Sequence, residues 1–338
     1  MRGLWGSLDR RAQIALLLVL TAVLSLGALA VLAAFAGWDD VVHRLGLPDQ
    51  GWFGLAVACE AIAFLGYVLA FRDVTRVEGG PELGWKEASQ VVAAGFGAFI
   101  VRGGAEVDTF ALRRSGADKE EARVRVLTLD ALEHAPLAPA AWLAAVALLA
   151  RGDRKPGLDF TLPWAVLVPA GAVAAVWGVR HRERFSGRDG WRGHLGSAFE
   201  AIYLLFRLAA TPRRHAGAFL GATLYWLGDV ACLWACLRPF DAEPALPALV
   251  IAHAVGYSLT RRTLPLAGAG IVELLMPLTL VAGGSPLGGA VLGVFVYRIC
   301  NLWLPLVPAL LALPPVRHLG ADAPTPHGSD EPALQSNA

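Results

Sequence analysis

Long apolar stretches separated by short charged loops dominate this sequence. Charged residues are absent from 12–38 and 160–179, and the stretch 263–316 contains only two, Glu273 and Arg298. A helix needs about 20 predominantly apolar residues to cross a bilayer. The pattern therefore predicts an all-α fold, a polytopic integral membrane helical bundle.

The apolar runs also predict where the individual spans lie. Seven membrane-spanning helices are expected, at about 13–36, 52–71, 122–150, 161–180, 216–238, 246–260 and 286–313. The further apolar run 88–101 is short, so the total is about seven to eight transmembrane helices.

The segment between Arg180 and Arg214 is the most basic loop of the chain and also carries a regular apolar pattern. The residues at helical spacing are Leu195, Phe199, Ile202, Phe206 and Ala209. An apolar stripe on an otherwise polar helix predicts an amphipathic helix lying on the membrane surface.

Two apolar segments are too short or too interrupted for ordinary spans. Ala88–Val101 has basic loops on both sides, and basic loops favour the cytoplasm. We therefore expect a re-entrant segment at about 86–104, with a tilted ordinary span as the alternative. Glycine and proline interrupt the second candidate, at about 264–284. Interrupted segments at corresponding places in two halves indicate a transport site, and whether the halves are a true repeat stays open.

The ends of the chain predict a domain boundary and an orientation. Arg2, Arg10 and Arg11 precede an apolar run that exceeds the about 7–15 residues of a signal peptide. We expect an uncleaved first helix, an N-terminus in the cytoplasm, and a multi-pass protein of the cell (plasma) membrane. Residues 1–316 are expected to form a single membrane domain, and 317–338 a disordered polar tail.

Composition strengthens the membrane class and excludes others. Hydrophobic residues make up 56% of the 338-residue chain and charged residues 17%, whereas a soluble domain carries about 25% charged residues. The mean hydropathy is +0.52. The net charge of +1 gives no overall attraction to nucleic acid, so none is expected as a partner.

Cysteine usage predicts packing rather than chemistry. Cys59, Cys232, Cys236 and Cys300 all lie in apolar runs, and the second and third share a helix face. No histidine or acidic cluster completes a ligand set. We therefore expect small packing residues, no metal site and no structural disulfide.

Lone charges inside apolar helices are candidates for function because each costs about 2.5–3.5 kcal/mol to insert. Glu273 and Arg298 form either a structural ion pair or a substrate site. The planar donors of Arg298 suit a phosphate, and a helix beginning after Gly268 and Gly270 would offer backbone N–H groups to the same anion.

Other ionisable residues have weaker signals. Arg102 and Glu106 follow the first re-entrant candidate, where a solvated loop end is the alternative. Glu60 and Asp229 lie within predicted helices and are interpreted as neutral hydrogen-bonded acids or as proton carriers. His253 is interpreted as a polar contact between helices.

Signatures of soluble catalytic sites are missing from the sequence. It contains no P-loop, no H-E-x-x-H, no G-x-S-x-G and no C-x-x-C. We therefore expect no built-in ATPase, no metal and no cofactor.

Two segments resemble the lysylphosphatidylglycerol synthase transmembrane-region family. The first is the short apolar run followed by Arg102-Gly103-Gly104-Ala105-Glu106 and the basic helix start Leu112–Arg125. The second is Leu264-Pro265…Gly268-Ala269-Gly270-Ile271-Val272-Glu273, followed by Gly283 and Tyr297-Arg298. The family pattern there is a Pro-Gly-Gly-x-Gly-type loop, a following Glu and a late Tyr/Leu-Arg. This chain departs from it at Ala267, where Pro is usual, and at Ala269. The likeness covers roughly residues 10–315.

The resemblance implies a helical bundle with re-entrant segments that moves lipids between leaflets. Aminoacyl transfer in the family belongs to a separate soluble C-terminal domain. We expect that domain to be absent from this chain, and a transporter rather than an enzyme. The expected partners are membrane lipids and a separate lipid-modifying enzyme, and the oligomeric state stays open.

The first functional hypothesis is a membrane lipid translocase, flippase- or scramblase-like, for a phospholipid or a lipid-linked anionic headgroup. The proposed substrate-binding residues are Arg102, Gly103, Gly104, Glu106, Gly268, Gly270, Glu273 and Arg298. The proposed proton-carrying residues are Glu60, Asp229 and Glu273. The alternatives are a membrane enzyme, or a non-catalytic subunit acting with a lipid-modifying or cell-envelope transferase.

Overall fold

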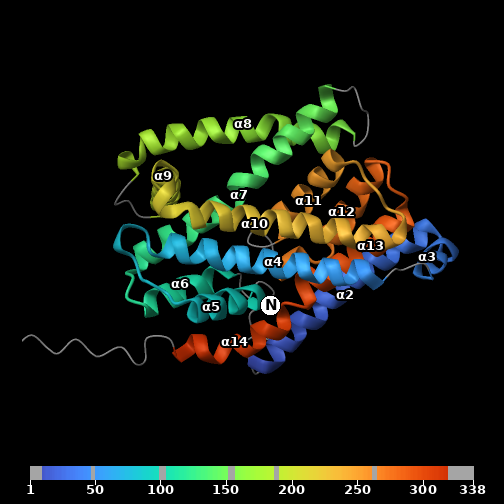
Figure 1. The fold of residues 1–338 in the computed structure, drawn as a ribbon, viewed down its shortest axis with the longest axis horizontal. Helices are drawn as coiled ribbons and strands as arrows, with labels where there is room; N and C mark the ends of the chain where they lie inside the picture. The colour runs from blue at the N-terminus through green and yellow to red at the C-terminus, as the bar shows by residue number, and fades with distance from the viewer. Residues whose placement is uncertain are drawn as a thin grey trace, which may run out of the picture.

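The computed structural model describes residues 10–46, 50–98, 104–150, 157–185, 190–260 and 265–318, and every regular element in these ranges is a helix (Figure 1). The α-helices are α2 Arg10–Ala36, α3 Trp38–Leu45, α4 Gln50–Thr75, α5 Trp85–Ala98, α6 Gly104–Arg114, α7 Lys119–Ala150, α8 Leu158–Arg180, α9 Trp191–Ala210, α10 Pro212–Leu237, α11 Leu246–Thr260, α12 Ile271–Ala282, α13 Leu287–Arg298 and α14 Leu306–His318. Short 3-10 turns are η1 Val77–Gly79, η2 Arg182–Arg184, η3 Arg238–Phe240 and η4 Pro265–Gly268, and η5 Ile299–Trp303 is a π-helix.

Six helical stretches in the described residues are long and apolar enough to cross a bilayer. They are Ala12–Ala36, Gln50–Thr75, Lys119–Ala150, Leu158–Arg180, Arg213–Phe240 and Leu287–Ala312. The predicted all-α polytopic membrane bundle is confirmed. The prediction of seven to eight transmembrane helices counted 246–260 as a span. The structure has this segment as α11, which is not among the six long stretches. That helix has 15 residues, about 22 Å at 1.5 Å per residue, and pairs with α12 instead of crossing alone.

Helices α4 and α10 form the most extensive helix pair of the bundle and run antiparallel. Gly66 of α4 faces the backbone of Gly221 on α10, and Gly228 of α10 faces the backbone of Cys59. At each contact a Cβ atom would overlap the opposite main chain. The small residues thus allow the two backbones to touch, as the Gly217–Gly221 spacing indicates for membrane helices. We call this contact the α4–α10 glycine seam.

Two helical hairpins enter this bundle from opposite ends. The first, α5 and α6, leaves from the end of α4 and returns to the start of α7. The second, α11 and α12, leaves from the end of α10 and returns to the start of α13. Because α4 and α10 are antiparallel, the hairpins begin at opposite ends of the molecule, as Figure 1 shows. This geometry supports the two re-entrant segments, which stay a prediction with respect to the bilayer.

The predicted helix 286–313 has a break that the apolar pattern did not reveal. Here α13 passes into the π-helix η5 and then into α14, so that the i to i+4 bonding is interrupted. The extra residue turns Asn301 toward Asp229 of α10, where its amide donates a hydrogen bond. Helix α14 runs to His318, two residues into the predicted tail, and 319–338 lie outside the described residues.

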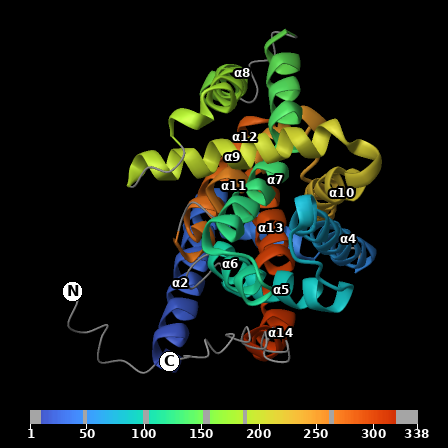
Figure 2. The same cartoon turned by 90° about the vertical axis from the view of Figure 1, so that its left-hand side faces the viewer.

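The outer helices expose apolar side chains. Only 6% of the apolar part of α8 is buried, and Leu167 and Val173 on it are 66% and 71% exposed. Figure 2 shows α8 at the periphery, held by α7 and α9. In a membrane protein such a surface faces lipid. Helix α9 covers the predicted amphipathic segment, with Ala201, Leu204 and Leu208 buried.

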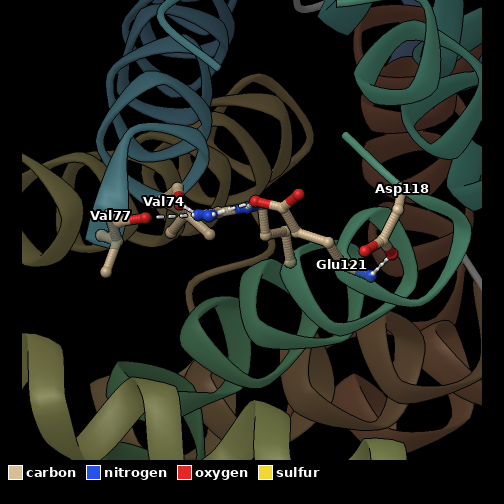
Figure 3. A network of polar contacts seen from close by, with 5 residues as sticks. Val74, Val77, Asp118 and Glu121 are labelled. Atoms are coloured by element: carbon tan, nitrogen blue, oxygen red, sulfur yellow. Dashed lines mark hydrogen bonds and ion pairs between the residues drawn. The ribbon is translucent and has the colours of Figure 1, made fainter. Parts of the chain in front are cut away.

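Arg125 of α7 links two helix termini at the basic end of the bundle. Its guanidinium donates to the carbonyls of Val74 (3.2 Å) and Val77 (2.8 Å) and to the carboxylate of Glu121 (2.7 Å). Asp118 accepts from the backbone N–H of Glu121, so the start of α7 is capped (Figure 3). Arg125 thereby donates to a carbonyl in the last turn of α4 and adds a second donor to the carbonyl of Val77 in η1, which also accepts from the N–H of Gly80.

Candidate functional site

The tip of the second hairpin lies at η4, where the backbone is unusual. Leu266, Ala267, Gly268 and Gly270 all have positive φ, at 59°, 52°, 67° and 86°. This left-handed conformation is readily adopted by glycine but costs free energy for leucine and alanine. This turn leads directly into α12, whose first residue is Ile271. Strained backbone of this kind is often retained at functional sites.

Glu273 stands in the first turn of α12, directly after this tip. Its Oε2 accepts a 2.7 Å bond from the backbone N–H of Gly270, and its Oε1 accepts a 2.7 Å bond from Nε of Arg298. Ser25 of α2 donates a third bond of 2.7 Å to Oε1. Nη2 of Arg298 also donates to the carbonyl of Ala267 at 3.3 Å. The ion pair therefore joins the hairpin tip to α13 and α2.

This pair is removed from solvent in the structure. Glu273 is 0% exposed and Arg298 2% exposed, and Ser25 is 2% exposed. Breaking a buried ion pair by removing one partner costs about 3–5 kcal/mol because the other charge remains. Of the sequence-predicted residues, Gly270, Glu273 and Arg298 thus form one site, and Gly268 lies beside it in η4. Arg298 reaches a phosphate only if this closed pair opens.

A second buried polar centre surrounds Asp229 of α10. Its Oδ1 accepts bonds from the hydroxyl of Tyr297 (2.9 Å) and the amide of Asn301 (2.8 Å), and its Oδ2 lies 3.1 Å from Nε2 of His253. Asp229 is 1% exposed and His253 0% exposed. The interpretation of His253 as a contact between helices agrees with this geometry, which also gives it an acidic partner.

The stacking of rings extends this centre toward α7. His253 stacks on Tyr257 with ring centres 5.8 Å apart, and the hydroxyl of Tyr257 donates a 2.7 Å bond to Glu133. Glu133 is buried, whereas the next residue, His134, is exposed. Glu60 of α4 is also buried, at 5% exposure. The fold thus gathers buried acids from three long helices.

The residues predicted beside the first hairpin lie apart from the Glu273 site. Glu106 is exposed on α6 and lines an open hollow of about 830 Å³ together with Arg113, Arg114 and Lys119. Among the described residues no hydrogen bond or ion pair joins Glu106 to Glu273 or Arg298. Gly104 begins α6, whereas Arg102 and Gly103 lie outside the described residues.

The three cysteines of α10 and η5 come together in a way that the sequence did not reveal. The sulfur atoms of Cys232, Cys236 and Cys300 lie within 4.8 Å of one another, and all three residues are buried. The first two are four residues apart, but the third is 64 positions further along the chain and reaches them only through the fold. Buried thiols in an apolar interior pack as small hydrophobic groups, and three sulfurs at this separation are also close enough to hold a metal ion, so the packing role stays a prediction.

The fold, the apolar outer face and the buried charges define a multi-pass helical membrane protein. A comparison with family profiles matches residues 14–309 to the family described as lysylphosphatidylglycerol synthase TM region. The chain belongs to this family, as the two motif segments indicate. A comparison with curated proteins gave no match.

Proposed function

We propose that this protein moves an anionic lipid between the two leaflets of the membrane. The observation that carries the proposal is the Glu273–Arg298 pair, placed inside the bundle at the tip of a broken helical hairpin. Discontinuous helices commonly build the substrate sites of membrane transporters, since their ends supply unpaired backbone groups. The membrane class and the lipid-related family agree with this role.

In this mechanism the ion pair opens to receive the headgroup. Arg298 releases the carboxylate of Glu273 and binds a lipid phosphate instead. A phosphate group can accept two parallel hydrogen bonds from a guanidinium. The backbone N–H of Gly270, which now binds Glu273, becomes available to the same anion. The acyl chains remain in the bilayer beside the exposed apolar helices. Arg102, Gly103, Gly104 and Glu106 of the first hairpin are proposed to receive the headgroup on the other side.

We also propose an orientation in the cell membrane, with the N-terminus in the cytoplasm. Helix α4 ends, and α7 and α10 begin, at one end of the bundle (Figure 1). Arg76, Arg125, Arg182, Arg207 and Arg214 belong to this end. Basic residues favour the cytoplasmic side of a membrane protein.

A liposome exchange assay tests the translocase role. Purified protein is reconstituted with acyl-labelled anionic phospholipid, and an impermeant quencher reports how much label lies in the outer leaflet. We expect complete quenching with the protein and about half without it. Exchange no faster than in empty liposomes, with anionic, zwitterionic and isoprenyl lipids alike, would remove the proposal and favour an enzyme or a non-catalytic subunit.

A paired substitution separates substrate binding from folding. Glu273→Gln or Arg298→Gln alone leaves one buried charge, so reduced folding is expected for each. The double variant Glu273→Gln/Arg298→Gln keeps hydrogen-bonding groups on both sides without charge, and such replacements are often tolerated. We expect a folded double variant whose exchange is at least tenfold slower. A folded double variant with wild-type exchange would make the pair purely structural.

A further inference from the structure

The buried centre around Asp229 has a feature that the Glu273 site lacks. Glu273 carries a fixed positive partner, Arg298, and accepts from three donors, so its charge is balanced. The partner of Asp229 is a histidine, whose imidazole carries a charge only when it is protonated. A site that changes charge reversibly inside a membrane bundle is suited to proton transport.

The hydrogen bonds fix how a proton would bind. With Asp229 ionised, Nε2 of His253 donates to Oδ2 at 3.1 Å, which leaves the lone pair on Nδ1. Nδ1 of His253 is buried and has no hydrogen-bond partner among the described residues. One proton added there converts a carboxylate and a neutral imidazole into an ion pair. The net charge of the two groups changes from −1 to 0.

The surroundings hold the pair in this arrangement. Tyr297 and Asn301 donate to Oδ1 of Asp229 and keep the carboxylate in place. Besides Asp229, the titratable neighbours of Tyr297 are Glu60 of α4 and Cys232 of α10. On α13 the nearest basic residue, Arg298, is occupied by Glu273 and the carbonyl of Ala267. No arginine or lysine in the described residues therefore pairs with Asp229.

A series of side-chain contacts leads from the same histidine toward α7. The ring of His253 stacks on Tyr257, which donates to Glu133 of α7. The exposed ring of His134, next to Glu133, contacts Tyr257 edge-on with centres 5.5 Å apart. These contacts connect the buried pair, through Tyr257, to Glu133 and His134 of α7.

We propose that Asp229 and His253 form a proton-binding site that couples proton movement to lipid movement. This inference rests on the proposed function and adds its driving force. One proton binds at Nδ1 of His253 from one side of the membrane and leaves to the other as the lipid changes leaflet. Proton binding belongs to the Asp229–His253 pair, whereas Glu273 serves in headgroup exchange.

The test measures lipid distribution under a pH gradient. Liposomes with acyl-labelled anionic phospholipid and entrapped pyranine receive a gradient of one pH unit, and leaflet occupancy and internal pH are followed together. For one proton per lipid we expect a distribution of up to about tenfold between leaflets, since one pH unit corresponds to a tenfold ratio. The pH gradient should also dissipate faster in liposomes that contain the anionic phospholipid than in liposomes that lack it.

Two conservative variants isolate the proton site. His253→Gln retains a side-chain donor toward Asp229 but binds no proton at neutral pH, and Asp229→Asn keeps an acceptor for Tyr297 without charge. Both variants should distribute the labelled lipid evenly between the leaflets, a ratio of about 1, at any pH gradient. Thr279→Val is the matched control. Thr279 is 0% exposed and bonds only within its own helix, so this variant should keep the wild-type ratio.

The outcomes distinguish this inference from the proposed function. If the wild-type protein exchanges lipid but its distribution between leaflets does not change with the pH gradient, proton coupling is overturned and the translocase role remains. A tenfold distribution that persists in folded His253→Gln places the proton elsewhere and overturns the site. Absence of exchange in every preparation overturns the proposed function, and this inference with it.

Discussion

Ser25 supplies the third donor to Glu273 from a helix 248 positions away in the sequence. Its hydroxyl is buried, so Ser25→Ala leaves the carboxylate with one donor fewer in a dry environment. A hydrogen bond to a charged group contributes about 1.5–3 kcal/mol, and we expect a loss of stability of that size. Thermal unfolding in detergent measures it.

A control for this change lies one turn away on α2. Thr21 is also buried, but its hydroxyl bonds to the carbonyl of Leu17 within the helix. Thr21→Val should therefore lower the unfolding temperature much less than Ser25→Ala. Equal effects would mean that the bond from Ser25 to Glu273 contributes nothing specific.

Arg125 provides a second test on single side chains. Arg125→Met retains the length of the stem but removes the donors to Val74, Val77 and Glu121. The carbonyls of Val74 and Val77 and the partly buried carboxylate of Glu121 each lose a donor, and we expect about 3–5 kcal/mol of destabilisation. Hydrogen exchange at the end of α4 should increase. Lys86→Met, on the exposed start of α5, is the control and should leave that exchange unchanged.

Some of these residues can be predicted from the sequence and others cannot. Glu273 and Arg298 are conspicuous because charges in apolar helices are costly and therefore rare. Ser25, Tyr297 and Asn301 give no such signal, since neutral polar residues insert into a membrane at little cost. Their roles depend on which helices become neighbours, and that information is not in the local pattern.

Among helices, the α4–α10 glycine seam gives a sharp prediction. A Cβ at Gly221 would overlap the backbone of Gly66 and Ala70, so Gly221→Ala should cost about 1–3 kcal/mol. Gly171 of α8 has no atom within 4 Å of an added Cβ. Gly171→Ala should therefore be neutral or slightly stabilising, because alanine favours helix. Unfolding of both variants under identical conditions checks the difference, and equal behaviour would contradict the seam.

The apolar pattern predicted most helices to within a few residues, because burial in lipid requires long uninterrupted runs. It could not predict the π-helix η5, since Leu287–Ala312 is apolar enough for a continuous span whether or not the bonding shifts by one residue. Nor could it decide between a tilted span and a returning hairpin at 88–101. That choice depends on α6 folding back against α5, which is a tertiary contact.

For the whole molecule, cysteine labelling tests the first hairpin and the orientation together. The four native cysteines are buried, so the background with an impermeant maleimide should be low. Single cysteines replace the exposed residues Glu82, Lys119 and Asp39. If α5 and α6 return to the side they left, positions 82 and 119 should be shielded in intact cells and react only after permeabilisation, whereas position 39 should react at once.

Opposite reactivity at positions 82 and 119 would mean that the segment between them crosses the membrane. Identical shielding of positions 39 and 82 would contradict a membrane crossing by α4, which lies between them. Each of these results changes the topology without depending on lipid transport.

The glycine seam also determines which parts of the protein are free to move. Main chains in direct contact leave no side chains between them that can change rotamer, and a shift of either helix along the other brings glycine opposite a larger residue. Helices α4 and α10 should therefore move as one rigid body through a transport cycle. In the proposed transport cycle, α12 and α2, joined to α13 by the polar contacts of Glu273, would move relative to the rigid pair of α4 and α10.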